Sequence, residues 1–113
     1  MSSNKVVITV SEELKSVVPP FLEKRKIDLP VLRTALKTGD FGTLETLGHR
    51  LRGNAGGYGF NRMGSLGAEI EAASKTKDSQ KIETVIDELE QYLSNIEVVY
   101  VAAIGNLWGS TGD

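Results

Sequence analysis

Hydrophobic residues recur every three or four positions along most of the chain, which predicts amphipathic helices separated by short breaks. The pattern predicts helices at about 20–38, 41–57 and 62–75, followed by a last helix that begins after Asp78. In that last helix the apolar positions keep regular steps of four and three residues, which is typical of a long bundle helix. These positions are Ile82, Ile86, Leu89, Leu93, Ile96, Tyr100, Ala103 and Leu107.

The breaks between these segments carry residues that end one helix and start the next. Gly39 suits the end of a helix, and Asp40 can cap the helix that follows. Asn61 and Asp78 can cap the two later helices in the same way. Pro30 lies inside the first long helix, but the apolar seam keeps its phase across it. We therefore expect one helix that is kinked near Pro30.

The first residues carry a weaker signal. Val6–Val10 could form a short extended lead-in. Thr9-Val10-Ser11-Glu12 has the form of a capping box, which predicts a short first helix at about Ser11–Val18. Pro19-Pro20 then turns the chain into the first long helix, because proline is tolerated in the first turn of a helix.

Four long amphipathic segments with short connections place successive helices antiparallel. We therefore predict an all-α protein, an up-down antiparallel four-helix bundle in which the short N-terminal helix covers one end. The 113 residues suit a single domain with one core. We expect residues 1–8 and 106–113 to be loosely ordered. We also expect a monomer, because the bundle needs the apolar row of its last helix for its own core.

Composition narrows the range of functions. The 13 basic and 15 acidic side chains give a net charge of −2 without a basic block, which argues against nucleic acid as a partner. The absence of cysteine excludes disulfides and cysteine-ligated metal. A di-metal bundle site needs Glu-x-x-His on two helices, and this chain has one histidine, so we predict no metal site. We find no secretory signal and no apolar run long enough for a bilayer, and we expect a cytoplasmic protein with no membrane partner.

The single histidine, His49, is the strongest candidate for chemistry. Steps of 100° per residue place it about 160° from the centre of its helix's apolar stripe, so the ring should face water. Gly53 and Gly56 follow on the same side, and exposed helical glycine costs about 0.5–1 kcal/mol relative to alanine, which indicates space cleared for a large partner. Arg52 adds a cation three residues on. Neutral histidine attacks phosphoryl groups and a guanidinium stabilises the product, which favours phosphoryl transfer.

The motif is His49-x-Leu51-Arg52-Gly53-x-Ala55-Gly56-x-x-Gly59-Phe60, followed by Met63, Leu66-Gly67 and Ile70-Glu71. It resembles the histidine phosphotransfer (HPt) domain of bacterial phosphorelays, and the resemblance covers most of the chain. It implies that His49 accepts a phosphoryl group and passes it to or from an aspartate of a response-regulator receiver domain. It also implies that Arg52 steadies the group and that Gly53 leaves room for the receiver.

The family also places a polar side chain of the next helix against the histidine, often 22 residues on, which here is Glu71. A carboxylate there would accept a hydrogen bond from Nδ1–H and leave Nε2 free to attack. Glu45, one turn before His49, could make this contact instead, and the sequence leaves both alternatives open. We expect Glu45, Gly56 and Lys75 to contact the docked partner.

The chain has no glycine-rich phosphate loop and no ATP-binding half, so another protein would have to deliver the phosphate. We therefore expect a phosphoryl carrier and not an enzyme with its own ATP site. No bound cofactor is expected on this chain, while Mg²⁺ is expected on the partner receiver domain, and a sensor histidine kinase is the other expected partner. The alternative function is a helical-bundle adaptor that binds a receiver or a kinase without carrying phosphate.

Overall fold

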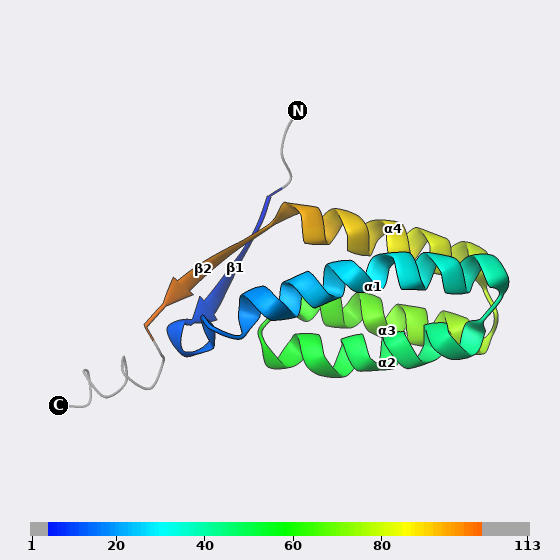
Figure 1. The fold of residues 1–113 in the computed structure, drawn as a ribbon, viewed down its shortest axis with the longest axis horizontal. Coiled ribbons are helices and arrows are strands. Elements are labelled where there is room, and N and C mark those ends of the chain that lie inside the picture. The colour runs from blue at the N-terminus through cyan, green and yellow to red at the C-terminus, as the bar shows by residue number, and fades with distance from the viewer. Residues whose placement is uncertain (1–4, 103–113) are drawn as a thin grey trace.

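The computed structural model describes residues 5–102, and its main feature is a bundle of four helices (Figure 1). Successive helices run in opposite directions and are joined by short turns, which confirms the predicted up-down bundle. The helices are α1 (Val18–Thr38), α2 (Phe41–Gly57), α3 (Asn61–Lys75) and α4 (Ser79–Asn95). Within residues 5–102, no helix is both long enough and apolar enough to cross a membrane.

The two ends of the described chain form a small parallel sheet, so the all-α prediction is confirmed for the bundle and is wrong for these two segments. Strand β1 (Val6–Ser11) pairs with strand β2 (Ile96–Val101) in register, from Val6 opposite Ile96 to Ser11 opposite Val101. The sheet lies at the end of the bundle where α1 begins and α4 ends (Figure 1). The extended lead-in predicted near the N-terminus is therefore confirmed, as a strand with a distant partner.

The predicted continuation of the last helix beyond Asn95 is wrong. The segment that follows is rich in β-branched residues, which favour extended backbone. Ile96 and Tyr100 lie in β2 and face the bundle, half-buried. A separation of four residues places two side chains on one side of a helix and also on one side of a strand. The remaining predicted positions, Ala103 and Leu107, lie outside the described residues.

Two further expectations, both for the N-terminal region, are wrong. The short helix predicted at Ser11–Val18 is replaced by a 3₁₀ turn, η1 (Glu12–Leu14), and the Ser11 side chain accepts a hydrogen bond from Glu13 N at 3.2 Å. The cap is therefore Ser11, the last residue of β1, whereas Thr9 of the expected capping box lies two residues earlier, inside the strand.

The expected loose order of residues 1–8 is wrong from residue 6 onward, because pairing with β2 orders the chain there. Residues 1–4 lie outside the described residues, as does the segment 106–113 that was also expected to be loosely ordered.

The ends of the long helices follow the predicted chemistry with one exception. Gly39 ends α1 with a φ of 72°, in the left-handed region that favours glycine. Asp40 and Asp78 each accept a hydrogen bond from the backbone N–H three residues on, at 3.1 and 3.2 Å. Asn61 is not a cap, since Phe60 occupies the N-cap position of α3 without a side-chain hydrogen bond. Helix α1 continues through Pro30 as a single helix.

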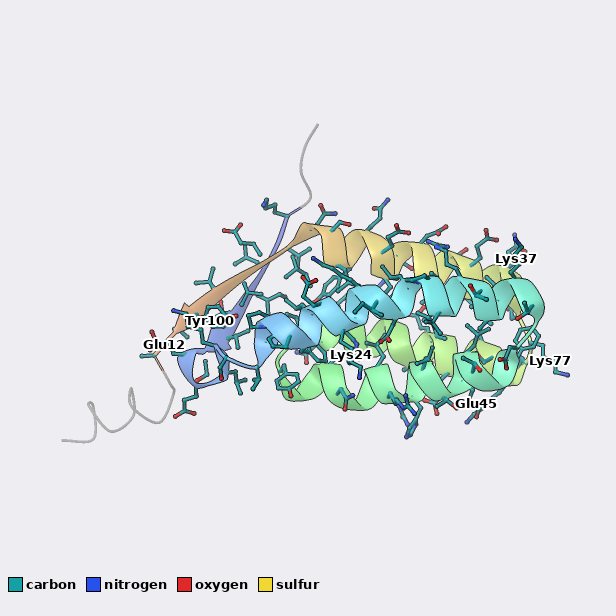
Figure 2. All side chains as sticks on the ribbon, viewed as in Figure 1. Glu12, Lys24, Lys37, Glu45, Lys77 and Tyr100 are labelled. Atoms are coloured by element: carbon teal, nitrogen blue, oxygen red, sulfur yellow. The ribbon has the colours of Figure 1, made fainter. Side chains whose placement is uncertain are left out.

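The core lies along the bundle axis, and charged side chains such as Lys37, Glu45 and Lys77 point outward around it (Figure 2). Helix α3 contributes Met63, Leu66, Ile70 and Ala73 to this core, all buried. The α1 seam also contains the buried Arg25, whose Nε lies 2.9 Å from Asp28 Oδ2. This contact is an ion pair without hydrogen-bond geometry, because Arg25 Nε has no hydrogen-bond partner among the described residues.

Candidate functional site

His49 lies in the middle of α2 on its solvent side. Its side chain is 63% exposed, which confirms the predicted outward orientation. The opposite side of α2 is anchored in the core by Leu44, Leu51 and Ala55, which are 0–5% exposed. The imidazole is thus presented on a helix whose other face is fixed by packing, so an approaching protein can reach the ring without rearranging the bundle.

Glu71 of α3 contacts the ring. Its Oε2 lies 3.1 Å from His49 Nδ1, and its side chain is only 14% exposed. The alternative carboxylate, Glu45, points instead toward Lys75, with its Oε2 3.9 Å from Lys75 Nζ. The sequence left open whether Glu71 or Glu45 contacts His49, and in the structure it is Glu71.

Arg52 completes a three-residue cluster. Its Nε lies 3.1 Å from Glu71 Oε1, and its Nη2 lies 3.2 Å from His49 Nδ1. One oxygen of the Glu71 carboxylate therefore faces the guanidinium and the other faces the imidazole. The ion pair with Arg52 and the contact with the imidazole together hold the carboxylate in place beside the ring.

The cluster favours one tautomer of His49. An ionised carboxylate only accepts hydrogen bonds, so the contact with Glu71 Oε2 requires the proton on Nδ1. In the other tautomer the Nδ1 lone pair would face that carboxylate oxygen without a proton between them, although Arg52 could then donate to Nδ1. Arg52 forms its ion pair with Glu71 in either tautomer, whereas only the Nδ1–H form lets the ring donate to the carboxylate, and we therefore assign the Nδ1–H tautomer. The lone pair of the neutral ring is then on Nε2, available as a nucleophile.

Two groups of glycine lie near the site, on opposite sides of α2. An ideal Cβ built on Gly53 or Gly56 would meet no atom within 4 Å, so the outer surface beside His49 is open. On the inner side, a Cβ on Gly48 would lie 2.7 Å from Glu71 N, and a Cβ on Gly67 would lie 2.7 Å from Arg52 N. Helices α2 and α3 therefore approach each other backbone to backbone at the level of His49.

Sequence reasoning missed this inner contact. Gly48 was not singled out, and Gly67 entered only as part of a family motif. The available signal was the pair Gly64 and Gly67, two small residues three positions apart on α3, because such a spacing lets another helix approach closely. The facing residue on α2 depends on the rotation of both helices, which the pattern alone does not define.

The expected docking residues surround the cluster. Glu45 lies one turn before His49 on α2, and Lys75 lies one turn after Glu71 on α3. Both are partly exposed, and their ion pair crosses from α2 to α3 beside the ring. Gly56 lies two turns beyond His49 on the open outer side of α2. The three residues therefore border the site along α2 and α3.

The comparisons with known proteins agree with this arrangement. A family model described as Hpt domain matches residues 20–98, well over half of the chain. The comparison with curated proteins found no match, and neither did the comparison with solved structures. The protein therefore belongs to the Hpt domain family, which confirms the resemblance seen in the motif. Hpt domains act in histidine phosphotransfer of two-component signalling, where they interact with kinases and receiver domains as phosphocarriers without a catalytic site of their own.

Proposed function

We propose that this protein is a phosphorelay carrier. His49 accepts a phosphoryl group from a phospho-aspartate of a receiver domain or from a sensor histidine kinase, and it passes the group to a receiver aspartate. It does so as a monomer in the cytoplasm. The observation that carries the proposal is an exposed imidazole whose Nδ1 is 3.1 Å from a largely buried carboxylate, with Nε2 left as the nucleophilic nitrogen.

The transfer step follows from this geometry. The Nε2 lone pair attacks phosphorus, an N–P bond forms, and the P–O bond to the aspartate breaks, leaving a free carboxylate on the receiver. The receiver also supplies the Mg²⁺. The ring gains positive charge as the N–P bond forms, and the Glu71 carboxylate beside Nδ1 stabilises that charge. Transfer to the next aspartate is the same step in reverse.

Arg52 supplies the positive charge for the phosphorylated state. Its side chain is 52% exposed, so the guanidinium is free to rotate from the ring toward phosphoryl oxygens. Its Nη2 lies 3.2 Å from His49 Nδ1, so the guanidinium is already beside the imidazole that carries the phosphoryl group. Arg52 thus serves two partners in turn, the Glu71 carboxylate before transfer and the phosphoryl group after it.

The partner docks on the outer surface of α2. Gly53 and Gly56 leave this surface without side chains, and the Glu45–Lys75 pair borders it on the side of α3. Since nothing in the described structure lies near the two glycine positions, a side chain there would obstruct only an incoming molecule. A receiver domain can therefore bring its aspartate close to the ring.

The test is transfer of radioactive phosphate from a phosphorylated receiver domain or from a histidine kinase. We expect label on the native protein that is acid-labile and base-stable, as a phosphoramidate is. The variant His49→Gln should take up no label while keeping its helical circular dichroism. Label retained by His49→Gln would refute the assignment of His49, and stable binding without label on the native protein would favour the adaptor function.

A further inference from the structure

The close contact between α2 and α3 occurs at the level of the site, through Gly48 and Gly67. We propose that these glycines are positioning residues, which set the helix separation at which Glu71 and Arg52 reach His49. Only the expected effect on the rate of phosphorylation rests on the proposed function. The positioning itself concerns the unphosphorylated ring and can be measured without a phosphoryl donor.

Gly48 lies directly against the residue that holds the ring. A Cβ at this position would be 2.7 Å from Glu71 N, 2.7 Å from Gly67 O and 3.2 Å from Glu71 Cα. All three are backbone atoms, so no side-chain rotation can make room for a methyl group. Because Gly48 precedes His49 in the chain, the backbone that carries the imidazole is in contact with the backbone that carries its carboxylate.

Gly67 makes the reciprocal contact. A Cβ there would be 2.7 Å from Arg52 N, 2.8 Å from Gly48 O and 2.8 Å from Leu51 Cβ. Gly67 lies one turn before Glu71 on the same side of α3. Each glycine therefore touches, on the opposite helix, the backbone of a residue whose side chain belongs to the cluster around His49.

The other glycines of these helices lack this property. Gly64, one turn earlier on α3, faces the same interface, but a Cβ there would be 3.6 Å or more from its neighbours, which is an ordinary van der Waals distance. At Gly53, Gly56 and Gly57 a Cβ would meet no atom within 4 Å. The requirement for glycine in the α2–α3 interface is thus confined to the level of His49.

The consequence for the site follows from the distances. A methyl group at Gly48 or Gly67 requires the backbones to separate by about 0.7 Å before a contact of 2.7 Å reaches the ordinary minimum of 3.4 Å. The same displacement would lengthen the contact of 3.1 Å between His49 Nδ1 and Glu71 Oε2 beyond hydrogen-bond length. The ring would then lose the acceptor that holds its proton on Nδ1.

The first measurement is the tautomer of His49, read from the ¹⁵N chemical shifts of the ring in the unphosphorylated protein. We expect the Nδ1–H form in the native protein and in Gly64→Ala, the matched control in the same interface. In Gly48→Ala and Gly67→Ala we expect a shift toward the Nε2–H form. Native-like tautomer populations in both of these variants would overturn the proposal.

The second measurement is the rate of phosphorylation of His49 by one fixed donor. Gly48→Ala and Gly67→Ala should lose roughly 10- to 100-fold in rate, the usual scale for removing a group that orients a reactive side chain. If Gly48 acts through Glu71, then Gly48→Ala should cause no further loss in a Glu71→Ala background. Additive losses would show a general structural effect and would refute a positioning role.

A third variant keeps the inference testable if both alanine variants fail to fold. Glu71→Asp withdraws the carboxylate by one methylene without adding an atom to the interface, and we expect the same change of tautomer. An unchanged tautomer in Glu71→Asp would also overturn the proposal, since the distance would then not matter. Absence of label on the native protein would refute the proposed function alone, because the tautomer measurement needs no phosphate.

Discussion

Helices α4 and α2 are held in the bundle by different means. Helix α4 buries six large side chains: Ile82, Val85, Ile86, Leu89, Tyr92 and Leu93. Ion pairs on its outer sides link Asp87 and Glu90 to Arg33 of α1, and Glu88 to Arg62 of α3. Helix α2 buries only Leu44, Gly48, Leu51 and Ala55, and it meets α3 through backbone contacts.

The difference indicates that α4 mainly stabilises the fold, whereas the contact between α2 and α3 mainly positions the side chains of the site. Large buried side chains contribute hydrophobic free energy in proportion to the apolar area that they remove from water. Glycine contributes none, but it allows two backbones to approach and so sets the distance between side chains that lie above the contact. We therefore expect substitutions in α4 to lower stability without changing the site. Substitutions between α2 and α3 should change the site first.

The largest expected effect on stability is that of Leu89→Ala in α4. Leu89 is 1% exposed, and truncation of a buried leucine costs about 2–5 kcal/mol of unfolding free energy, which urea denaturation would measure. The folded fraction should keep the native tautomer of His49. A change of tautomer in this variant would contradict the separation of the two regions.

The corresponding change at the site is Glu71→Gln. The amide keeps the size of the side chain but lacks the charge that stabilises the phosphorylated ring. We expect phosphoryl transfer to slow by about 10- to 100-fold, or about 1.4–2.7 kcal/mol in the barrier, as measured by single-turnover labelling. Glu69→Gln on the same helix is the matched control, because Glu69 pairs with Arg62 and Lys81 and not with the ring. Equal rates for Glu71→Gln and the native protein would show that the carboxylate has no role in transfer.

Substitution of an outer glycine of α2 should change stability and phosphoryl transfer in opposite directions. Gly53→Ala adds a methyl group where nothing lies within 4 Å, so it should stabilise the fold by about 0.5–1 kcal/mol through helix propensity. The same variant should transfer phosphate to a receiver domain more slowly, because the methyl group lies where the partner docks. Thermal unfolding and transfer kinetics measure the two effects. Unchanged transfer would remove Gly53 from the docking surface.

The ion pairs of α4 are expected to contribute less than its core. Hydrogen bonds to Glu90 and Asp87 raise the pKa of Arg33, and the two contacts are 2.5 and 2.8 Å long. The side chain is 39% exposed, so solvent screens these pairs. We expect Arg33→Ala to cost about 0.5 kcal/mol, with a smaller cost at high salt. A cost independent of salt in urea denaturation would point to lost packing of the side-chain stem.

The helices could be predicted from the sequence because their signals are local. The apolar repeat, Gly39, Asp40 and Asp78 all act within a few residues of where they stand. The sheet could not be predicted in this way, because β1 and β2 stabilise each other across nearly the whole chain. The spacing of Ile96 and Tyr100 suits helix and strand alike, and only the run of β-branched residues between them favoured the strand.

The site likewise has features that follow from local sequence and features that depend on packing between distant residues. Helical phase was enough to predict an exposed His49 with Arg52 beside it, and the family resemblance suggested Glu71. The choice between Glu71 and Glu45 depends on how closely α2 and α3 approach and how each is rotated. Those quantities arise from the contact of Gly48 with α3, which involves residues about 20 positions apart and leaves no periodic pattern.

The smallest expected effect concerns the start of α2. Hydrogen bonds from the Thr43 side chain and backbone lower the pKa of Asp40, which accepts both of them as the N-cap. Because the pKa is lower in the folded state, the stabilisation is fully present above the unfolded pKa, about 3.9, and is lost as pH falls through the folded pKa. Asparagine also caps helices but does not titrate in this range. The melting temperature of Asp40→Asn should therefore fall less steeply than that of the native protein between pH 5 and pH 3. Parallel pH profiles would show that this carboxylate does not contribute to acid sensitivity, and the cause would then lie with carboxylates elsewhere, such as those that pair along α4.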